Sequence, residues 1–329
     1  MLRIGAAIIG LAACLCLSLA TDAQQRRSTP RTSSQQLERP KEALPVPERD
    51  SKAPAIWPEE QRAGPLGPEV RVQRWRIPTT DGSNTFMAAT VVRPLTDEPR
   101  PLAVLNHGTP FARDVPHLIE PYHRFAAEWF VERGFVVVMP LRRGHGITGG
   151  PKAEFTTCKN PDYIKAGVEA SRDIQATIDY MYQQPFVKKG HIVVVGISTG
   201  GYSSLGFASL NPKDVKAIIN FAGGRGGFVN RVPQATCDAA RLIETAGKFG
   251  ETARVPTLWI YNENDNFFGP DLARAMHAAF VKGGGLAEFH MLPPFGQDGH
   301  VLYGHRDGIR IWSPIVEAFL KRADALPSP

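Results

Sequence analysis

The chain has 329 residues, of which 21% are charged and 43% are hydrophobic, and its formal net charge is +6. This composition is typical of a globular protein that can bury a large core, and it argues against a largely disordered chain. The positive charges are dispersed rather than clustered on one face or one helix, so we expect neither nucleic acid nor a membrane surface as a partner.

The first 23 residues have the pattern of an export signal. Arg3 precedes an uncharged apolar run over residues 4–20, and Ser18-Leu19-Ala20 is a small-x-small cleavage site. The run is short for a membrane-spanning helix. We therefore expect a signal peptide over residues 1–23, a periplasmic or secreted protein, and no stable membrane insertion once the signal is removed.

An alternative for this segment is lipidation. Leu11-Ala12-Ala13-Cys14 resembles a bacterial lipobox, which would make Cys14 the lipid-bearing N-terminus. The apolar run continues past Cys14, which favours simple cleavage.

Residues 24–68 are rich in Pro, Ser, Gln, Arg and Glu and have no sustained apolar period. Such a segment cannot bury enough apolar surface to offset the entropy of ordering, so it is predicted to be a disordered linker. One folded domain is expected over residues 69–325. The sequence leaves its oligomeric state open.

The folded part begins with two predicted strands, over residues 70–77 and 86–92. The turn residues Asp81-Gly82 between them favour an antiparallel hairpin. Apolar strands and helices then alternate. The further strands are predicted over 103–105, 135–139, 192–195, 217–221, 257–261 and 288–292, and the helices over 117–133, 163–182, 202–208, 234–247, 271–281 and 309–321.

This alternation predicts a mostly parallel sheet covered by helices on both faces, which is an α/β fold. In the helix over 163–182, we expect one buried face made of Ile164, Val168, Ser171, Ile174 or Gln175, Ile178 and Met181.

The stretch Gly196-Ile197-Ser198-Thr199-Gly200 lies between a predicted strand and a predicted helix. A G-x-S-x-G at such a junction is the nucleophile elbow, which presents the serine hydroxyl on a tight turn. Glycine-rich turns also occur without function, so the prediction requires an acid and a base at suitable positions further along the chain.

Two residues of the required types are found at the ends of later strands. Asp265 comes after the strand over 257–261, and His300 comes after the strand over 288–292. Glu263 and Asp271 are rival acids, and His305 is a rival base. The order Ser, Asp, His is that of the α/β-hydrolases.

On these motifs, the chain resembles the α/β-hydrolase superfamily, and most closely the dienelactone hydrolase-like and prolyl-oligopeptidase-like (S9-type) domains. The matching stretches are 106–110, 142–146, 196–201, 264–265 and 298–300. The chain departs from the dienelactone hydrolases at position 198, where it carries serine instead of a cysteine nucleophile.

The resemblance implies that Ser198 attacks a carbonyl carbon, that His300 takes its proton, and that Asp265 orients the imidazole. It also implies an oxyanion hole formed by the backbone N–H groups of Thr199 and Thr109, since Pro110 has no N–H.

Five further residues are candidates for substrate binding. Arg142 could bind a substrate carboxylate, although such an arginine more often ties loops together. Phenylalanines could line an acyl or aromatic pocket, with core packing as the alternative. They are Phe111, Phe228, Phe267 and Phe268.

Cys158 and Cys237 are the two cysteines outside the signal, and in an exported protein an even pair predicts a disulfide. No metal-binding motif is present, and no nucleotide-binding glycine pattern with the right spacing comes after a strand. We therefore predict no metal and no cofactor. Residues 222–254 interrupt the alternation of strands and helices, either as a cap over the site or as a surface excursion.

The sequence thus predicts an exported serine hydrolase with a small-molecule ester as its substrate. A short peptide is the alternative substrate, for a peptidase or amidase of S9 type with the same triad. A binding protein on an inactive hydrolase scaffold is the non-enzymatic alternative, but it would be expected to show a broken triad.

Overall fold

The structure is a computed structural model that describes residues 70–327, except 83–84, 97 and 110–122. The predicted signal peptide over 1–23, the lipidation alternative at Cys14, the linker over 24–68 and the candidate Phe111 lie outside the described residues. They stay predictions.

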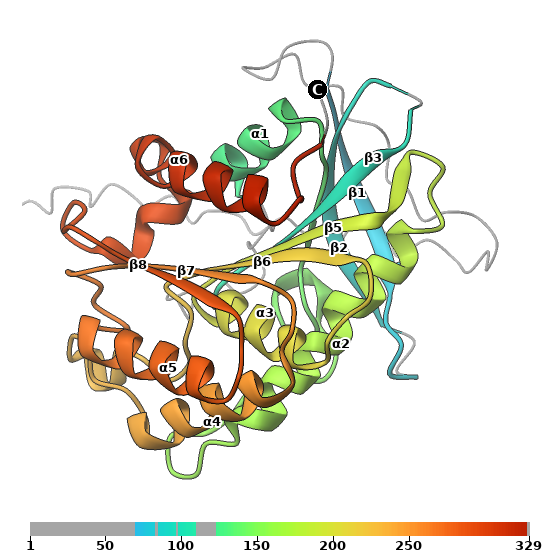
Figure 1. Ribbon diagram of the computed structural model, residues 1–329. Coiled ribbons are helices and arrows are strands. Elements are labelled where there is room, and N and C mark those ends of the chain that lie inside the picture. Colours follow the sequence, from blue (N-terminus) through green and yellow to red (C-terminus); the bar gives the residue numbers. More distant parts are fainter. Residues whose placement is uncertain (1–69, 83–84, 97, 110–122, 328–329) are drawn as a thin grey trace, which may run out of the picture. The chain divides into compact units, whose positions relative to one another are not determined.

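An eight-stranded sheet organises the described residues (Figure 1), with the strand order β1-β2-β4-β3-β5-β6-β7-β8. β1 pairs with β2, and β2 with β4, in antiparallel register, while all other neighbours are parallel. The predicted mostly parallel sheet with an antiparallel N-terminal hairpin is therefore confirmed. The strands are β1 Val70–Pro78, β2 Phe86–Pro94, β3 Arg100–Asn106, β4 Val136–Pro140, β5 Val187–Ile197, β6 Val215–Phe221, β7 Thr257–Asn262 and β8 Ala287–Leu292.

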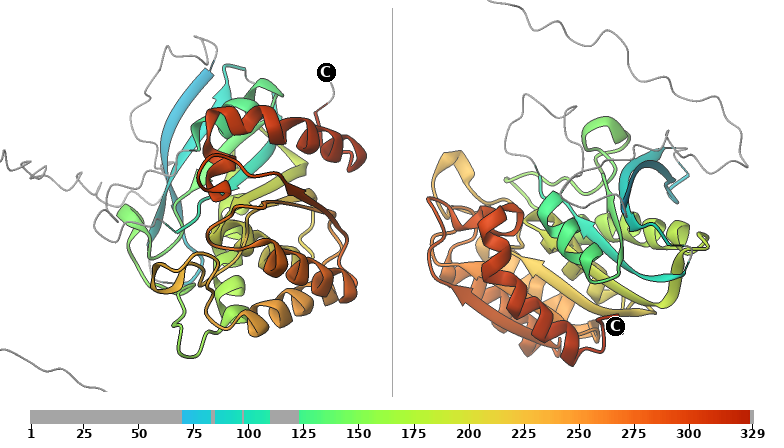
Figure 2. Two further views of the ribbon diagram at one scale, coloured as in Figure 1. Left: turned by 90° about the vertical axis from the view of Figure 1, so that its left-hand side faces the viewer. Right: turned by 90° about the horizontal axis from the view of Figure 1, so that it is seen from above.

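Helices cover both faces of the sheet: α1 and α6 lie on one face, and α2 to α5 lie on the other (Figures 1 and 2). The helices are α1 Arg124–Glu132, α2 Tyr163–Met181, α3 Thr199–Ser209, α4 Ala239–Thr252, α5 Pro270–Lys282 and α6 Arg306–Arg322, with 3-10 turns η1 Gly146–Thr148, η2 Val229–Arg231 and η3 Gly299–Gly304.

The central strand β5 shows why the strands are continuously apolar. Ile192 and Val194 belong to the core under α2 to α5, whereas Val193 and Val195 belong to the core under α1 and α6. Successive side chains of a strand point to opposite faces, and here both faces are covered, so all four of these positions are buried.

The expected buried face of α2 is partly wrong. Ile164 is 41% exposed and Val168 is only half buried, whereas Gly167 faces a neighbouring helix. A Cβ placed on Gly206 of α3 would lie 2.9 Å from Gly167, so the two helices meet at a pair of glycines. Close packing of the two helices requires small residues at this contact. A prediction based on large apolar side chains does not detect such a contact.

The helix expected over 234–247 begins later, at Ala239. Asp238 caps it, because its carboxylate accepts the backbone N–H of Arg241. α4 packs against α3 and α5, within the helical layer on that face of the sheet. Among the residues that the structure describes, no helix combines the length and the apolarity needed to cross a membrane.

Candidate active site

Ser198 lies at the turn between β5 and α3 with φ 56° and ψ −124°, a conformation that residues other than glycine rarely adopt. The glycines around it are required by contact. A Cβ on Gly196 would collide with the backbone of Gly200, and one on Gly200 would collide with the carbonyl of Asn106. The strand, the turn and the helix therefore approach closely, as a nucleophile elbow requires.

The structure brings Asp265 and His300 together from the ends of β7 and β8. Nδ1 of His300 lies 3.1 and 3.0 Å from the two carboxylate oxygens of Asp265, which is fully buried. One of these oxygens also accepts the backbone N–H groups of Phe267 and Phe268, at 2.7 and 2.9 Å. The carboxylate is thus held in place, and it favours the imidazole tautomer with a proton on Nδ1.

The ring of Phe267 stacks on that of His300, with centroids 4.2 Å apart. Asp298 fixes the backbone beside it, because one carboxylate oxygen accepts the N–H groups of both His300 and Asn266 at 3.0 Å. Ring stacking and backbone capping together restrict the imidazole to one orientation.

The rival residues have other positions. Among the described residues, Asp265 is hydrogen bonded to His300, and neither Glu263 nor Asp271 is. His305 caps α6, since its Nδ1 accepts the backbone N–H of Asp307.

Ser198 lies where two cavities meet. The first, of about 700 Å³, we name the His300 cavity; its walls include Ile197, His300, Val301 and Tyr303. The second, of about 690 Å³, we name the Tyr163 cavity; its walls include His145, Phe155, Tyr163 and Arg225. Thr109, Ser198, Phe228 and Phe267 line both.

Within the described part of the chain, no hydrogen bond joins the Ser198 hydroxyl to His300. Such contacts are often long before substrate binds, and Ser198 and His300 line the same cavity.

The two predicted oxyanion donors flank Ser198. The hydroxyls of Thr109 and Thr199 are hydrogen bonded at 3.0 Å, and a Cβ on Gly108 would lie 2.9 Å from that of Ser198. Thr199 is the first residue of α3, where backbone N–H groups have no partner within the helix.

The predicted substrate-binding residues divide into two groups. Phe228 and Phe267 line both cavities, and the buried Phe268 forms part of the Tyr163 cavity. Arg142, in contrast, lines neither cavity. It is fully buried and binds the carboxylate of Glu154, which fits the alternative of an arginine that ties loops together.

Sequence reasoning missed Tyr163, His145 and Arg225 as residues of the cavity wall. In the sequence, Tyr163 belongs to a predicted helix and Arg225 to a glycine-rich segment. His145 follows the paired arginines 142–143 and belongs to no motif that predicts a position in a cavity wall. Only the folded chain brings them to the same wall.

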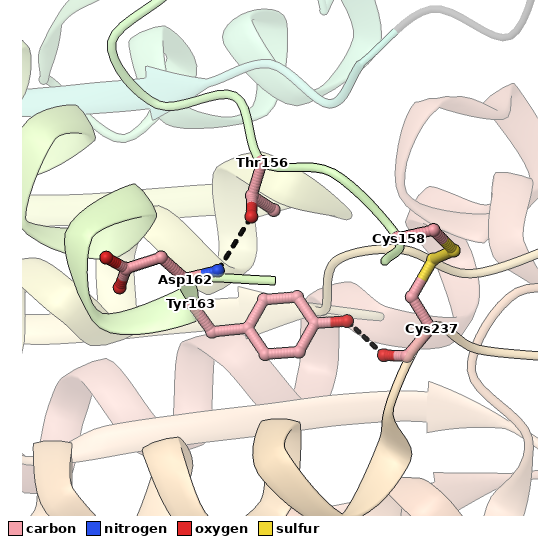
Figure 3. The surroundings of a disulfide bond; sticks show 5 residues. All are labelled: Thr156, Cys158, Asp162, Tyr163 and Cys237. Carbon is pink, nitrogen blue, oxygen red and sulfur yellow. Dashed lines mark hydrogen bonds between the residues drawn. A yellow bond between two sulfur atoms is a disulfide. The ribbon is translucent and has the colours of Figure 1, made fainter. Parts of the chain in front are cut away.

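Cys158 and Cys237 form the disulfide that the sequence predicts, with Cα atoms 5.1 Å apart (Figure 3). The hydroxyl of Tyr163 donates a hydrogen bond to the carbonyl of Cys237, and the backbone N–H of Asp162 donates to the hydroxyl of Thr156 at 2.7 Å. Both cysteines line the Tyr163 cavity, so the bridge joins two segments of its wall.

The segment over 222–254 contributes to the site only through its first part. Residues 225–228 and Cys237 line the Tyr163 cavity, whereas α4 belongs to the helical layer. No group of three or more His, Cys, Asp or Glu that could hold a metal ion occurs among the described residues.

Comparison with known protein families gives a match over part of the chain. A family model described as X-Pro dipeptidyl-peptidase (S15 family) matches residues 81–231. A search of curated protein sequences finds no match.

Three solved structures illustrate the similarity of fold. A Klebsiella pneumoniae protein assigned as a dienelactone hydrolase has a TM-score of 0.53 at 16% identity, over 77% of this chain and 99% of that one. Pyrococcus horikoshii acylaminoacyl peptidase has a TM-score of 0.56 at 16% identity, over 77% of this chain and 41% of that one. The acetyl xylan esterase of Paenibacillus sp. R4 has a TM-score of 0.56 at 14% identity, over 84% and 90%.

The sheet order, the elbow and these neighbours define the class: the chain has the α/β-hydrolase fold. The match to the S15 peptidase model and the similarity to dienelactone hydrolases and S9-type peptidases, which the sequence resemblance predicted, support a hydrolase of the serine α/β-hydrolase type.

Proposed function

We propose that this protein is an exported serine hydrolase that cleaves carboxylic esters through an acyl-enzyme intermediate. One observation carries the proposal. A serine in the elbow conformation lines the same cavity as a histidine whose Nδ1 is hydrogen bonded to a buried carboxylate.

In this proposal, His300 accepts the proton of the Ser198 hydroxyl as the oxygen attacks the carbonyl carbon. The negative charge on the carbonyl oxygen is stabilised by the backbone N–H groups of Thr109 and Thr199. His300 then gives the proton to the departing alkoxide, and the acyl group stays on Ser198. Water repeats the sequence to release the acid, while Asp265 stabilises the imidazolium.

The position of His300 supports a role for each cavity. The leaving group must lie near the imidazole that protonates it, so in this proposal the alcohol occupies the His300 cavity and the acyl group occupies the Tyr163 cavity. The walls of the His300 cavity include the apolar Ile197 and Val301, so an apolar alcohol fits there.

A peptidase is the second candidate, because the matching family model is that of X-Pro dipeptidyl-peptidase. A peptidase that removes residues from a free amino terminus needs an anionic partner for the ammonium group. Among the described residues that line the Tyr163 cavity there is no Asp or Glu. Asp298 lines the His300 cavity, but one of its oxygens already accepts two backbone N–H groups. These contacts favour the esterase.

Export is proposed from the predicted signal over 1–23. The disulfide supports it, since such bonds persist in oxidising compartments.

The test uses the exported protein and its variant Ser198→Ala, with nitrophenyl esters, a peptide anilide and a fluorophosphonate probe in parallel. The variant should lose ester hydrolysis and labelling while keeping the wild-type circular dichroism spectrum. His300→Ala should be severely impaired, whereas the matched variant His305→Ala, which changes another histidine in the wall of the same cavity, should keep most of its kcat. Wild-type turnover in Ser198→Ala would refute the mechanism, and faster cleavage of the anilide than of the esters would favour the peptidase.

A further inference from the structure

A single buried carboxylate lies at the centre of a network behind the candidate oxyanion hole. Glu154 is 2% exposed. Its side chain accepts two hydrogen bonds from Arg142, at 3.0 and 3.2 Å, and one from Arg225 at 2.9 Å. The ring of His145 donates a further one. The roles of Ser198 and His300 explain none of these contacts.

One arm of the network reaches Thr109. The guanidinium of Arg142 donates a hydrogen bond to the carbonyl of His107 at 2.9 Å, and the backbone N–H of Arg142 donates one to Nε2 of His107 at 3.1 Å. Nδ1 of His107 donates to the carbonyl of Gly108 at 2.8 Å. Arg142 thus holds His107 directly and Gly108 through the ring of His107, and these two residues directly precede Thr109.

The other arm reaches Thr199. The guanidinium of Arg225 donates to the hydroxyl of Ser203 at 3.3 Å, and that hydroxyl donates to the carbonyl of Thr199 at 2.7 Å. Arg225 also donates to the backbone carbonyl of Glu154 at 3.0 Å. Through Arg225 and Ser203, Glu154 is therefore connected to Thr199, which carries the second donor.

The charges of the network make Glu154 difficult to replace. Burial, and then the charge of Arg142, lowers the pKa of His107 well below its usual value, and burial lowers the pKa of His145. Both rings are therefore neutral, and Glu154 is the counterion of two buried guanidiniums. Removing its charge leaves both without compensation, so the two arms have to move toward other acceptors.

We propose that Glu154 is a positioning residue for the oxyanion hole, which sets the separation of the Thr109 and Thr199 donors through Arg142 and Arg225. The inference rests on the proposed function. Oxyanion donors act only when they lie about 2.7–3.1 Å from the developing oxyanion. A small displacement of either arm therefore reduces the stabilisation of the transition state more than it reduces the binding of the substrate.

The test compares Glu154→Gln, which keeps the shape but not the charge, with wild type. Rates of ester hydrolysis are divided by the concentration of active sites titrated with the fluorophosphonate. We expect kcat to fall about 10- to 100-fold, which does not exceed the fall expected from removing one oxyanion donor. We expect KM to change less than about threefold. The affinity for a boronic acid, which forms a tetrahedral adduct on the serine, should fall by a similar factor.

Asp173→Asn is the matched control. Asp173 is an equally buried carboxylate on the neighbouring Arg143, whose other acidic partners are Asp81 and Glu169. That network makes no contact with Thr109 or Thr199 among the described residues. Asp173→Asn should therefore lose stability but keep its kcat per titrated site.

Ser203→Ala provides a second variant, which removes only the link between Arg225 and Thr199. It should fold even where Glu154→Gln does not, and it should lower kcat about 3- to 10-fold with KM unchanged. An unchanged kcat per titrated site in both Glu154→Gln and Ser203→Ala would overturn the inference, as would an equal loss in Asp173→Asn. Wild type without hydrolysis or labelling would instead refute the proposed function, and the inference with it.

Discussion

Removing the disulfide by the double substitution Cys158→Ser and Cys237→Ser should lower the free energy of unfolding by about 4.5 kcal/mol. The bridge spans a sequence separation of 79 residues. In the chain-entropy relation, a loop of that length restricts the unfolded chain by about 15 cal/mol/K, or about 4.5 kcal/mol at 25 °C. For a domain of this size the melting temperature should fall by roughly 9–18 °C.

The same change should alter substrate binding, because the bridge joins two segments of the wall of the Tyr163 cavity. Without it, two hydrogen bonds among the described residues still hold Cys237: its carbonyl accepts one from the Tyr163 hydroxyl, and its backbone N–H donates one to the carbonyl of Gly226. KM should rise for esters with bulky acyl groups, which contact this wall, and stay unchanged for a small acetyl ester.

The assay is urea unfolding of the oxidised wild type, the reduced wild type and the double variant, after mass spectrometry of the unreduced protein has verified the bond. Reduced wild type should match the variant, and reductant should leave the variant unaffected. A difference below about 1 kcal/mol between oxidised wild type and the variant would refute the reasoning. The packing of α4 would then suffice to hold the segment over 222–254.

The geometry supports three further predictions. Gly200→Ala should abolish activity and destabilise the fold by roughly 1–3 kcal/mol or more, because its Cβ would collide with the backbone of Asn106. The matched control is Gly247→Ala in α4, where the new Cβ would meet only ordinary van der Waals contacts. In urea titrations this control should raise the free energy of unfolding by up to about 1 kcal/mol. Burial raises the pKa of Glu154, but its two guanidinium partners outweigh burial and hold that pKa well below its usual value. The carboxylate therefore contributes its full stabilisation of the fold above about pH 4.5, and this contribution is lost as the pH falls toward the pKa of the folded state. The difference in unfolding free energy between wild type and Glu154→Gln should therefore narrow from neutral to acid pH, and a constant difference would contradict this. Ester hydrolysis should survive exhaustive treatment with a chelator, and loss of activity that a divalent ion restores would indicate a metallohydrolase.

The sequence by itself determined most of the elements and singled out the residues of the proposed triad. Apolar runs and turn residues are local signals, and they placed every strand except β5 to within three residues at each end, whereas β5 begins five residues before its predicted start. The elbow is equally local, since Gly196 and Gly200 are required by contacts within one strand-turn-helix unit and the neighbouring turn. Asp265 and His300 could be found because the carboxyl ends of parallel strands meet at one edge of a sheet.

Only the tertiary structure decided the partners of buried groups. Nothing local places β4 between β2 and β3, because strand pairing depends on the whole sheet. The sequence alone makes Arg142 a candidate for substrate binding, and only the fold brings Glu154 beside it. Arg225, 71 residues from Glu154, joins the same carboxylate from another segment. A buried charge takes whichever partner the fold brings within hydrogen-bond distance, and that choice is made by long-range packing rather than by neighbouring residues in the sequence.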